Sequence, residues 1–381
     1  MNNIYDMLND AEQYEGRIER VELTDVEKRK ILNQITGQKH KKHGTRTATV
    51  AAAFAAVLIV GTSAYAAVKH FGIVDYYANN SSVNLPQEEV EKLVDTQVQQ
   101  ELVGSDNEED SLVDFHIREA LCDNNQLVVE VEAVPTDPEH YILAPTDCDL
   151  NCPATDLLID GVTEGTAGEY AAAQGKEILR VGAMIADESI TGNSMDFVRE
   201  EDGTLMIVVT CANVIQEDIM NLTCLTNYIN AKDHSVENVV HGEFTFKLTD
   251  ESNTRQLVYV PDDDTAAEDI GGSVLDELVV DQTELTIGIQ TKWHLTKALS
   301  EQEKIEDYAI DFHIYTEDGT RLEFIMGSGQ GETCQQLADG TWELERTDVY
   351  ETMDLPDTLI VKAYDYSKAE EVGEFVVHLK K

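Results

Sequence analysis

The stretch VDFHIREALCDNNQLVVEV, at Val113–Val131, decides the fold of the chain around it. Apolar and polar residues alternate up to Ile117, which is the two-residue period of a half-buried strand. A polar turn follows at residues 122–125, and Leu127–Val131 is again rich in β-branched residues. The pattern predicts a β-hairpin, and with it a mainly β fold.

The same kind of pattern extends this first β domain over residues 111–262. Asp-Gly pairs, which favour tight turns, stand at Asp160 and Asp202. We also expect a helix near Gln216–Thr223. Further short apolar runs predict strands at Ile178–Ile185, Leu205–Cys211, Phe244–Leu248 and Leu257–Val260.

A charge run and paired glycines between Pro261 and Ser273 predict a domain boundary, because few contacts cross such a segment. Residues 274–381 are then a second β domain. The number and spacing of its strand candidates are typical of a small immunoglobulin-like sandwich. These candidates are Leu285–Thr291, Ala309–Thr316, Arg321–Met326, Thr341–Glu345, Leu359–Ala363 and Glu374–Leu379.

The charge of the chain limits its partners. Of 381 residues, 74 are acidic and 27 basic, so the formal net charge is −47. A surface this negative repels phosphate backbones, which excludes nucleic-acid binding by the bulk of the chain. Residues 1–68 carry a net charge of +1, so the excess of acidic over basic residues lies in residues 69–381.

An uncharged apolar run at residues 47–68 matches the roughly 20 residues that cross a bilayer as a helix. Seven Lys or Arg and no acid lie between Lys28 and Arg46, so the positive-inside rule places residues 1–46 in the cytoplasm and the rest outside the cell. We expect a single-pass protein of the cell membrane that contacts lipid through residues 47–68. A signal peptide cleaved near Ala64–Ala66 and an Ala-rich core helix are the alternatives.

Two short amphipathic helices are expected before the span. A capping-box pattern at Thr24–Glu27 starts the second helix, and Gly37 ends it. Such helices are marginal alone, so their apolar faces indicate a partner. The candidate partner-binding residues are Ile4, Leu8, Ile31, Leu32 and Ile35. After the span, we expect a helical stalk and acidic linker over residues 69–110, with one helix running from Gln87 to Leu102.

No pattern in the sequence predicts catalysis. The six cysteines allow fifteen disulfide pairings, and buried free thiols are the alternative. Asp147, Asp149 and Asn151 begin like a calcium loop, but Cys152 stands where such a loop needs glycine. No nucleophile elbow, phosphate loop or dinucleotide fingerprint is present. We therefore predict no catalytic, cofactor-binding or metal-binding residues and no enzyme activity.

The amino-terminal stretch MNNIYDMLNDAEQYEGRIERVELTDVEKRKILNQI, with its basic run and span, resembles the membrane proteins of domain-of-unknown-function family 4179. The stretch Ile117–Val131 resembles the first outer domain of that family, and residues from Leu285 onward are similar to the immunoglobulin-like domain that accompanies it. The resemblance implies an anti-sigma-factor-like regulator. Zinc-type anti-sigma factors carry a His-x-x-x-Cys-x-x-Cys cluster, whereas the first cysteine here is Cys122.

Two functions follow as hypotheses. In the first, the outer β domains sense an envelope signal while the cytoplasmic helices hold an extracytoplasmic-function sigma factor. In the second, the protein is an extracytoplasmic binding or structural module without a transcriptional role, and its cytoplasmic segment only fixes its topology. An outer-surface hydrolase is a third possibility for which no set of residues proposes a mechanism.

Overall fold

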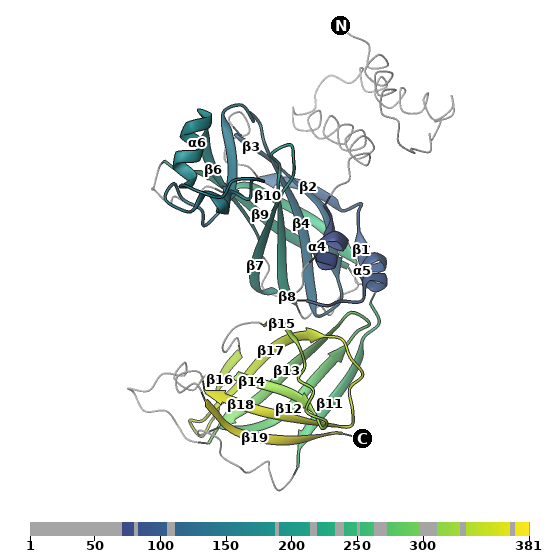
Figure 1. Ribbon diagram of the computed structural model, residues 1–381. Helices are drawn as coiled ribbons and strands as arrows, with labels where there is room; N and C mark the ends of the chain where they lie inside the picture. The colour runs from purple at the N-terminus through teal and green to yellow at the C-terminus, as the bar shows by residue number, and fades with distance from the viewer. Residues whose placement is uncertain are drawn as a thin grey trace, which may run out of the picture. The chain divides into compact units, whose positions relative to one another are not determined.

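The computed structural model describes two β domains and the short helices that precede them (Figure 1). The expected cytoplasmic helices and the expected span at residues 47–68 lie outside the described residues. Within the described part of the chain, no helix is both long and apolar enough to cross a membrane. The described residues are 71–79, 83–104, 111–186, 190–213, 219–232, 240–249, 252–262, 273–296, 311–327, 333–365 and 370–380.

The first β domain contains two five-stranded sheets. Neighbouring strands are antiparallel, except that β5 and β6 are parallel. The first sheet has the order β1 (Val94–Asp95), β3 (Val113–Cys122), β4 (Gln126–Pro135), β8 (Leu205–Asn213) and β7 (Ile190–Arg199). The second sheet has the order β2 (Gln99–Gly104), β10 (Val240–Thr249), β9 (Ile219–Asn230), β6 (Glu177–Ile185) and β5 (Tyr141–Pro145).

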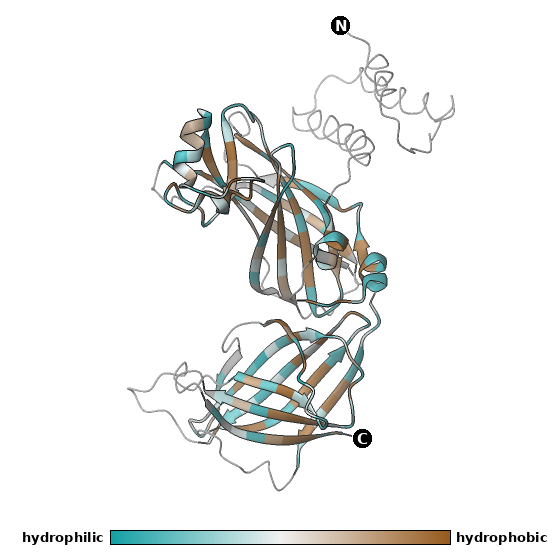
Figure 2. Cartoon of the chain, in the orientation of Figure 1, coloured by the Kyte–Doolittle hydropathy of each residue, from teal (hydrophilic) through white to brown (hydrophobic). Residues whose placement is uncertain are grey.

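The predicted hairpin is confirmed, since β3 pairs antiparallel with β4 from Val113 to Cys122. Alternate β4 residues, Leu127, Val129 and Val131, are fully buried in one core with Phe246 of the second sheet. Hydrophobic and hydrophilic residues accordingly alternate along many strands in Figure 2. The two sheets thus pack face to face in a sandwich-like arrangement, as the sequence pattern predicts.

A small helical insert joins β5 to β6. It contains the 3-10 helix η3 (Ala154–Leu157) and the helix α6 (Ala167–Gln174). Thr166 and Glu169 form a reciprocal capping box at the start of α6, and Gly175, with φ of 69°, ends it in the left-handed region that glycine favours.

The second β domain is one sheet of nine strands that curves around its own core. Ile314 of β14 and Leu344 of β17, from opposite parts of the sheet, are buried in the same cluster. The strand order is β14 (Asp311–Thr316), β18 (Thr358–Asp365), β19 (Glu370–Leu379), β11 (Arg255–Pro261), β12 (Ser273–Gln282), β13 (Thr286–Leu295), β17 (Trp342–Glu351) and β15 (Phe324–Gly327), with β16 (Thr333–Gln336) also paired to β17.

The structure differs from the expectation at two helices. The helix expected over Gln87–Leu102 is present only as α5 (Gln87–Leu93), because the β-branched Val94 is already extended and paired with Leu121. Residues 94–104 therefore contain strands β1 and β2 of the first domain rather than a helical stalk. The helix expected near Gln216–Thr223 overlaps β9, which pairs with strands on both sides.

The position of β11 also differs from the expectation. We expected this strand in the first domain, but β11 pairs with β12 and β19 in the nine-stranded sheet of the second domain. The charged segment between Pro261 and Ser273 therefore joins two strands of one sheet. Polarity alone does not separate such a connection from a domain linker, because both are solvated.

Candidate functional site

The β3–β4 turn is capped by its own first side chain. The Asp123 amide donates to the Gln126 carbonyl oxygen at 3.2 Å. Asp123 Oδ1 accepts bonds from the amides of Asn125, at 3.3 Å, and Gln126, at 2.9 Å. Asn124 has a φ of 66°, in the left-handed region that asparagine tolerates. The turn is therefore held rigidly by local bonds.

The β12–β13 turn of the second domain is built in the same way. The Thr283 amide donates to the Thr286 carbonyl oxygen at 2.9 Å. Thr283 Oγ1 accepts bonds from the amides of Leu285, at 3.1 Å, and Thr286, at 2.8 Å. A threonine hydroxyl here takes the capping role that the Asp123 carboxyl takes in the first domain.

These two turns meet tip to tip. Asp123 Oδ2 lies 3.1 Å from Thr283 Oγ1 and accepts a bond from the Thr286 hydroxyl at 2.5 Å. In the opposite direction, Asn125 Nδ2 donates to the Asp281 carbonyl oxygen at 2.9 Å and lies 3.1 Å from Thr286 Oγ1. We call this contact the joint. It connects the two β domains through buried polar groups.

A glycine makes room for the joint. A Cβ atom on Gly288 of β13 would lie 2.3 Å from Asn125 Oδ1 and 2.7 Å from Asn125 Cγ. Every other residue type would displace the Asn125 side chain. Gly288 therefore fits the close approach of the first domain to the second.

Burial makes Asp123 electrostatically unusual. The residue is fully buried, and this desolvation raises the pKa of the Asp123 carboxyl from 3.8 to about 7. Hydrogen bonds from Thr286, Gln126 and Thr283 act in the opposite direction and offset only part of the rise. Burial, with the charges of Tyr76 and Asp123, also raises the pKa of the Tyr77 phenol. The joint thus holds a carboxyl that titrates near neutrality.

The helices α4 (Ile73–Asn79) and α5 (Gln87–Leu93) pack beside the joint. They share one apolar cluster with the outer face of the first sheet and with the tip of the β12–β13 turn. Burying each such side chain stabilises the assembly by roughly 1.5–3 kcal/mol. The buried members of this cluster are Ile73, Tyr77, Leu85, Val90, Leu121, Val128, Val208 and Leu285.

The chain that leads into α4 is fixed to the first sheet by carboxylates. The Phe71 amide donates to Glu200 at 3.2 Å, and the Ile73 amide donates to Glu119 at 2.8 Å. A Cβ on Gly72 would lie 2.7 Å from the Glu119 carboxylate, so glycine permits this contact. The first described residues of the chain are therefore held by the first β domain.

Two further bonds fasten the helical segment. The Tyr76 hydroxyl of α4 donates to Asp196 of β7 in the first domain. The Asn84 amide, which lies between α4 and α5, donates to Glu351 of the second domain. The segment from Phe71 to Leu93 therefore contacts both domains, and any change at the joint also changes its surroundings.

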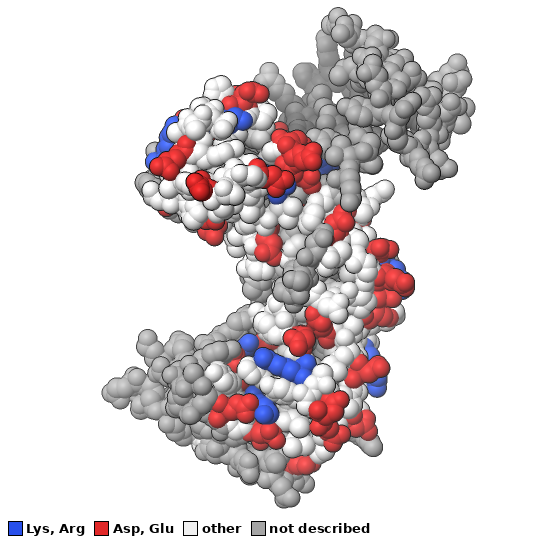
Figure 3. Space-filling model, viewed as in Figure 1, with Lys and Arg blue, Asp and Glu red and all other residues white. Residues whose placement is uncertain are grey.

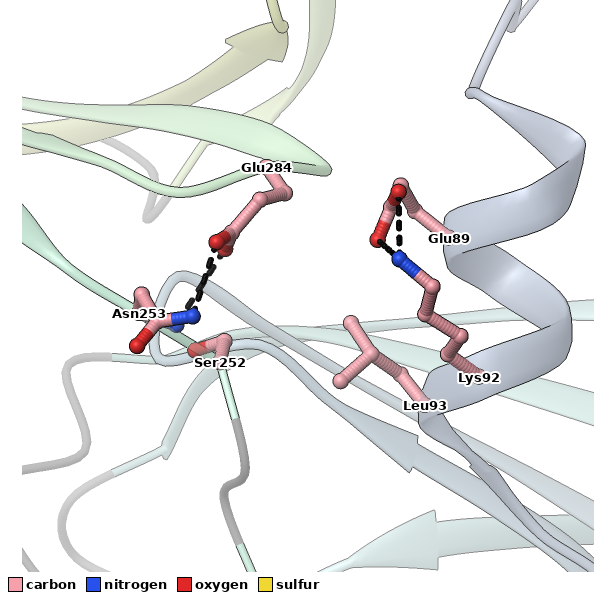
Figure 4. A pocket seen from close by; sticks show the side chains of 6 residues that line it. All are labelled: Glu89, Lys92, Leu93, Ser252, Asn253 and Glu284. Carbon is pink, nitrogen blue, oxygen red and sulfur yellow. Dashed lines mark hydrogen bonds and ion pairs between the residues drawn. The ribbon is translucent and has the colours of Figure 1, made fainter.

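A small open depression lies beside the joint (Figure 4). Its polar groups already bind one another: Lys92 pairs with Glu89 at 2.8 Å, and Asn253 Nδ2 donates to Glu284 at 2.8 Å. Asp and Glu also dominate the charged surface visible in Figure 3. Among the described residues, no group of three or more His, Cys, Asp or Glu side chains could hold a metal ion. The polar side chains of this depression therefore connect the elements that line it.

The sequence-predicted site residues lie elsewhere. The five partner-binding candidates, Ile4, Leu8, Ile31, Leu32 and Ile35, lie outside the described residues. In the loop that begins like a calcium site, Asp149 Oδ1 accepts bonds from the amides of Asn151, at 2.6 Å, and Cys152, at 3.2 Å. Among the described cysteines, four are free thiols: Cys148, Cys152, Cys211 and Cys224.

Comparison with known proteins finds no matching family model and no matching curated protein. One solved structure to which the chain is similar is the crystal structure of the conserved domain protein from Bacillus anthracis. The match has a TM-score of 0.44 and 12% sequence identity, and it covers 77% of this chain and 94% of that chain.

Proposed function

We propose that the protein is a single-pass membrane regulator that resembles an anti-sigma factor. In this proposal both β domains lie outside the cell, the second as an immunoglobulin-like module, and they receive an envelope signal. Residues 1–46 hold an extracytoplasmic-function sigma factor through Ile4, Leu8, Ile31, Leu32 and Ile35. The basic run before the apolar stretch at residues 47–68 supports this orientation.

The observation that carries the proposal is the attachment of Phe71 and Ile73. These residues follow the expected span within five positions, and their amides bind Glu200, which directly follows β7, and Glu119 of β3. A regulator that sends a signal across a membrane needs such a stiff connection, because a flexible linker would absorb the movement. Displacement of the first domain would therefore move Phe71 and Ile73, which follow the expected span in the chain.

The second domain acts on the same segment. Leu285 at the tip of the β12–β13 turn shares an apolar cluster with Ile73 and Val90, and Glu351 binds the Asn84 amide. A ligand that changes the contact between the domains would thus change the packing of α4 and α5. The sigma factor would be released by this rearrangement or by proteolysis within the membrane.

Co-purification of the tagged full-length protein from its native membrane tests the cytoplasmic part of the proposal. A control that lacks residues 1–36 is purified in parallel, and bound soluble proteins are identified by mass spectrometry. We expect a sigma factor with the full-length protein and none with the control. If the two samples hold the same proteins, the protein is a surface module and the regulatory function is wrong.

A reporter gene driven by the recovered sigma factor tests the outer connection. Combined Glu119→Ala and Glu200→Ala substitutions remove both carboxylates that hold the chain before α4, so we expect altered reporter output without an external signal. Glu164→Ala, on an exposed glutamate of the insert, is the matched control and should change nothing. An unchanged reporter in the double variant, with normal protein levels, would contradict the connection.

A further inference from the structure

Within the described part of the chain, the Asp123 carboxyl has no counter-charge. The joint places it between two domains, fully buried, with two hydroxyl groups on Oδ2 and two backbone amides on Oδ1. Among the described residues, no Lys, Arg or His side chain forms an ion pair with it. An ionised carboxylate in such a place is costly, whereas a neutral carboxylic acid is not.

Lys92, in the depression beside the joint, pairs with Glu89 and not with Asp123. The other described titratable groups around the joint do not supply a positive charge. From α4 the Tyr77 phenol faces Asp123, and from β3 the neighbouring Cys122 thiol is buried. On the β12–β13 side, the Asp281 carboxylate accepts a bond from Gln256, and the Glu284 carboxylate accepts a bond from Asn253. Both carboxylates therefore bind residues other than Asp123. Each of these groups is neutral or negative, which favours the protonated form of Asp123.

The hydrogen bonds of the joint can be completed with a proton on Oδ2. The Thr283 hydroxyl lies 3.1 Å from Asp123 Oδ2 and also 3.1 Å from the Thr286 carbonyl oxygen. A protonated Oδ2 can donate to Thr283 Oγ1 while the Thr283 hydroxyl turns to that carbonyl, and the Thr286 hydroxyl still donates to Oδ2. Because Thr283 Oγ1 has two lone pairs, it then accepts this bond at the expense of the longer amide bond from Leu285, at 3.1 Å. Protonation therefore removes the buried charge and weakens one amide bond.

We propose that the joint is a pH-sensitive contact in which Asp123 binds a proton from solvent, so that the two domains are held firmly in mildly acidic conditions and loosely in alkaline ones. The chemical signal is the proton itself, and the responding element is the pair of facing turns. The inference concerns the two described β domains and does not depend on the sigma factor.

Hydrogen–deuterium exchange of the full-length protein in lipid nanodiscs tests this contact. Exchange is measured by mass spectrometry at about pH 5.5 and about pH 8.5, on either side of the Asp123 transition, with labelling times scaled for the intrinsic pH dependence of amide exchange. We expect peptides with residues 123–126 and 283–286 to lose at least about tenfold in protection at the higher pH. Equal protection at both values would overturn the proposal.

Two variants assign the effect to Asp123. Asp123→Asn cannot ionise, so its two turns should show equal protection at both pH values. Glu284→Gln is the matched control in the same hairpin, and it should keep the full pH dependence because the pKa of Glu284 already lies below its usual value. Persistent pH dependence in a folded Asp123→Asn protein would overturn the proposal.

A third variant keeps the test decisive if Asp123→Asn does not fold. Thr286→Val preserves side-chain shape but removes a hydroxyl that stabilises the carboxylate of Asp123. The midpoint of the pH transition should therefore move to higher pH. A midpoint that stays in place or moves to lower pH would assign the transition to another group.

Discussion

Asp123 and Thr283 are the first residues of two turns with the same construction, and their side chains lie 3.1 Å apart across the contact between the β domains. Each side chain first fixes its own turn and then meets the other. Because both turns are held by local bonds, a change in the charge of Asp123 cannot be absorbed by movement of a flexible loop. It must alter the fit between the domains.

The stability of the protein should fall as the pH rises toward neutrality. The pKa of Asp123 is raised from 3.8 to about 7, so between these values the folded protein holds a proton that the unfolded chain has released. The stabilisation is complete below about pH 4 and is lost by about pH 7, a difference of roughly 4 kcal/mol at most. Urea unfolding across this range measures it, and Asp123→Asn should flatten the slope. An equal slope in the folded variant would contradict the assignment.

Gly288→Ala should weaken the joint. The new methyl group would meet Asn125 Oδ1 at 2.3 Å, so the Asn125 side chain must leave its bonds to Asp281 and Thr286. We expect a loss of about 1–3 kcal/mol in the free energy of unfolding. A double-mutant cycle with Asn125→Ala provides the control, because removal of that side chain removes the clash. Additive effects would contradict the proposed contact.

Arg199→Lys should loosen the helical insert of the first domain. The half-buried guanidinium donates to the carbonyl oxygens of Leu157, Gly203 and Leu143, and desolvation lowers the pKa of Arg199 to about 10. A lysine ammonium cannot reach three separated acceptors, and each acceptor left unbonded costs about 1–3 kcal/mol. Limited proteolysis should cut residues 146–176 faster. Arg255→Lys, at an exposed arginine, should not change the rate.

Cys211 and Cys224 should resist alkylation in the native protein. Both thiols are buried in the core of the first domain, and burial raises the pKa of each to about 12. The reactive thiolate is therefore scarce at neutral pH. Among the cysteines whose side chains are described, we expect iodoacetamide to modify the half-buried Cys152 first and to reach Cys211 and Cys224 only in denaturant. Rapid modification of Cys224 in folded protein would contradict this core.

Local sequence patterns predicted much of the fold but not all of it. The β3–β4 hairpin was predictable because most of its inward residues, such as Phe115, Ile117 and Val129, are strongly apolar. In β9 the buried inward positions are Leu222, Cys224, Thr226 and Tyr228, so the contrast with the outward residues is weak. This segment is a strand because it pairs with β10 and β6, and a local sequence pattern carries no information about these partners.

The joint could not be predicted because its halves are distant in sequence. Asp123 was recognised as a turn residue, but its partner Thr283 lies 160 residues later. Either residue alone is an ordinary turn-capping side chain. The one available signal is that both hairpins carry a capping side chain at the first turn position. Burial of the carboxyl follows from domain packing, which no single turn reveals.

The position of β11 has a consequence for the order of folding. Its partner β12 follows soon after in the chain, but its other partner, β19, is made more than a hundred residues later. Until Val377 and His378 have been synthesised and paired, the backbone N–H and C=O groups of Tyr259 and Val260 form an unpaired strand edge. Such an edge can pair with a strand of another chain. Closure of this sheet must therefore be a late and slow event. The first domain, whose hairpin pairs locally, can be complete while the second is still vulnerable to aggregation.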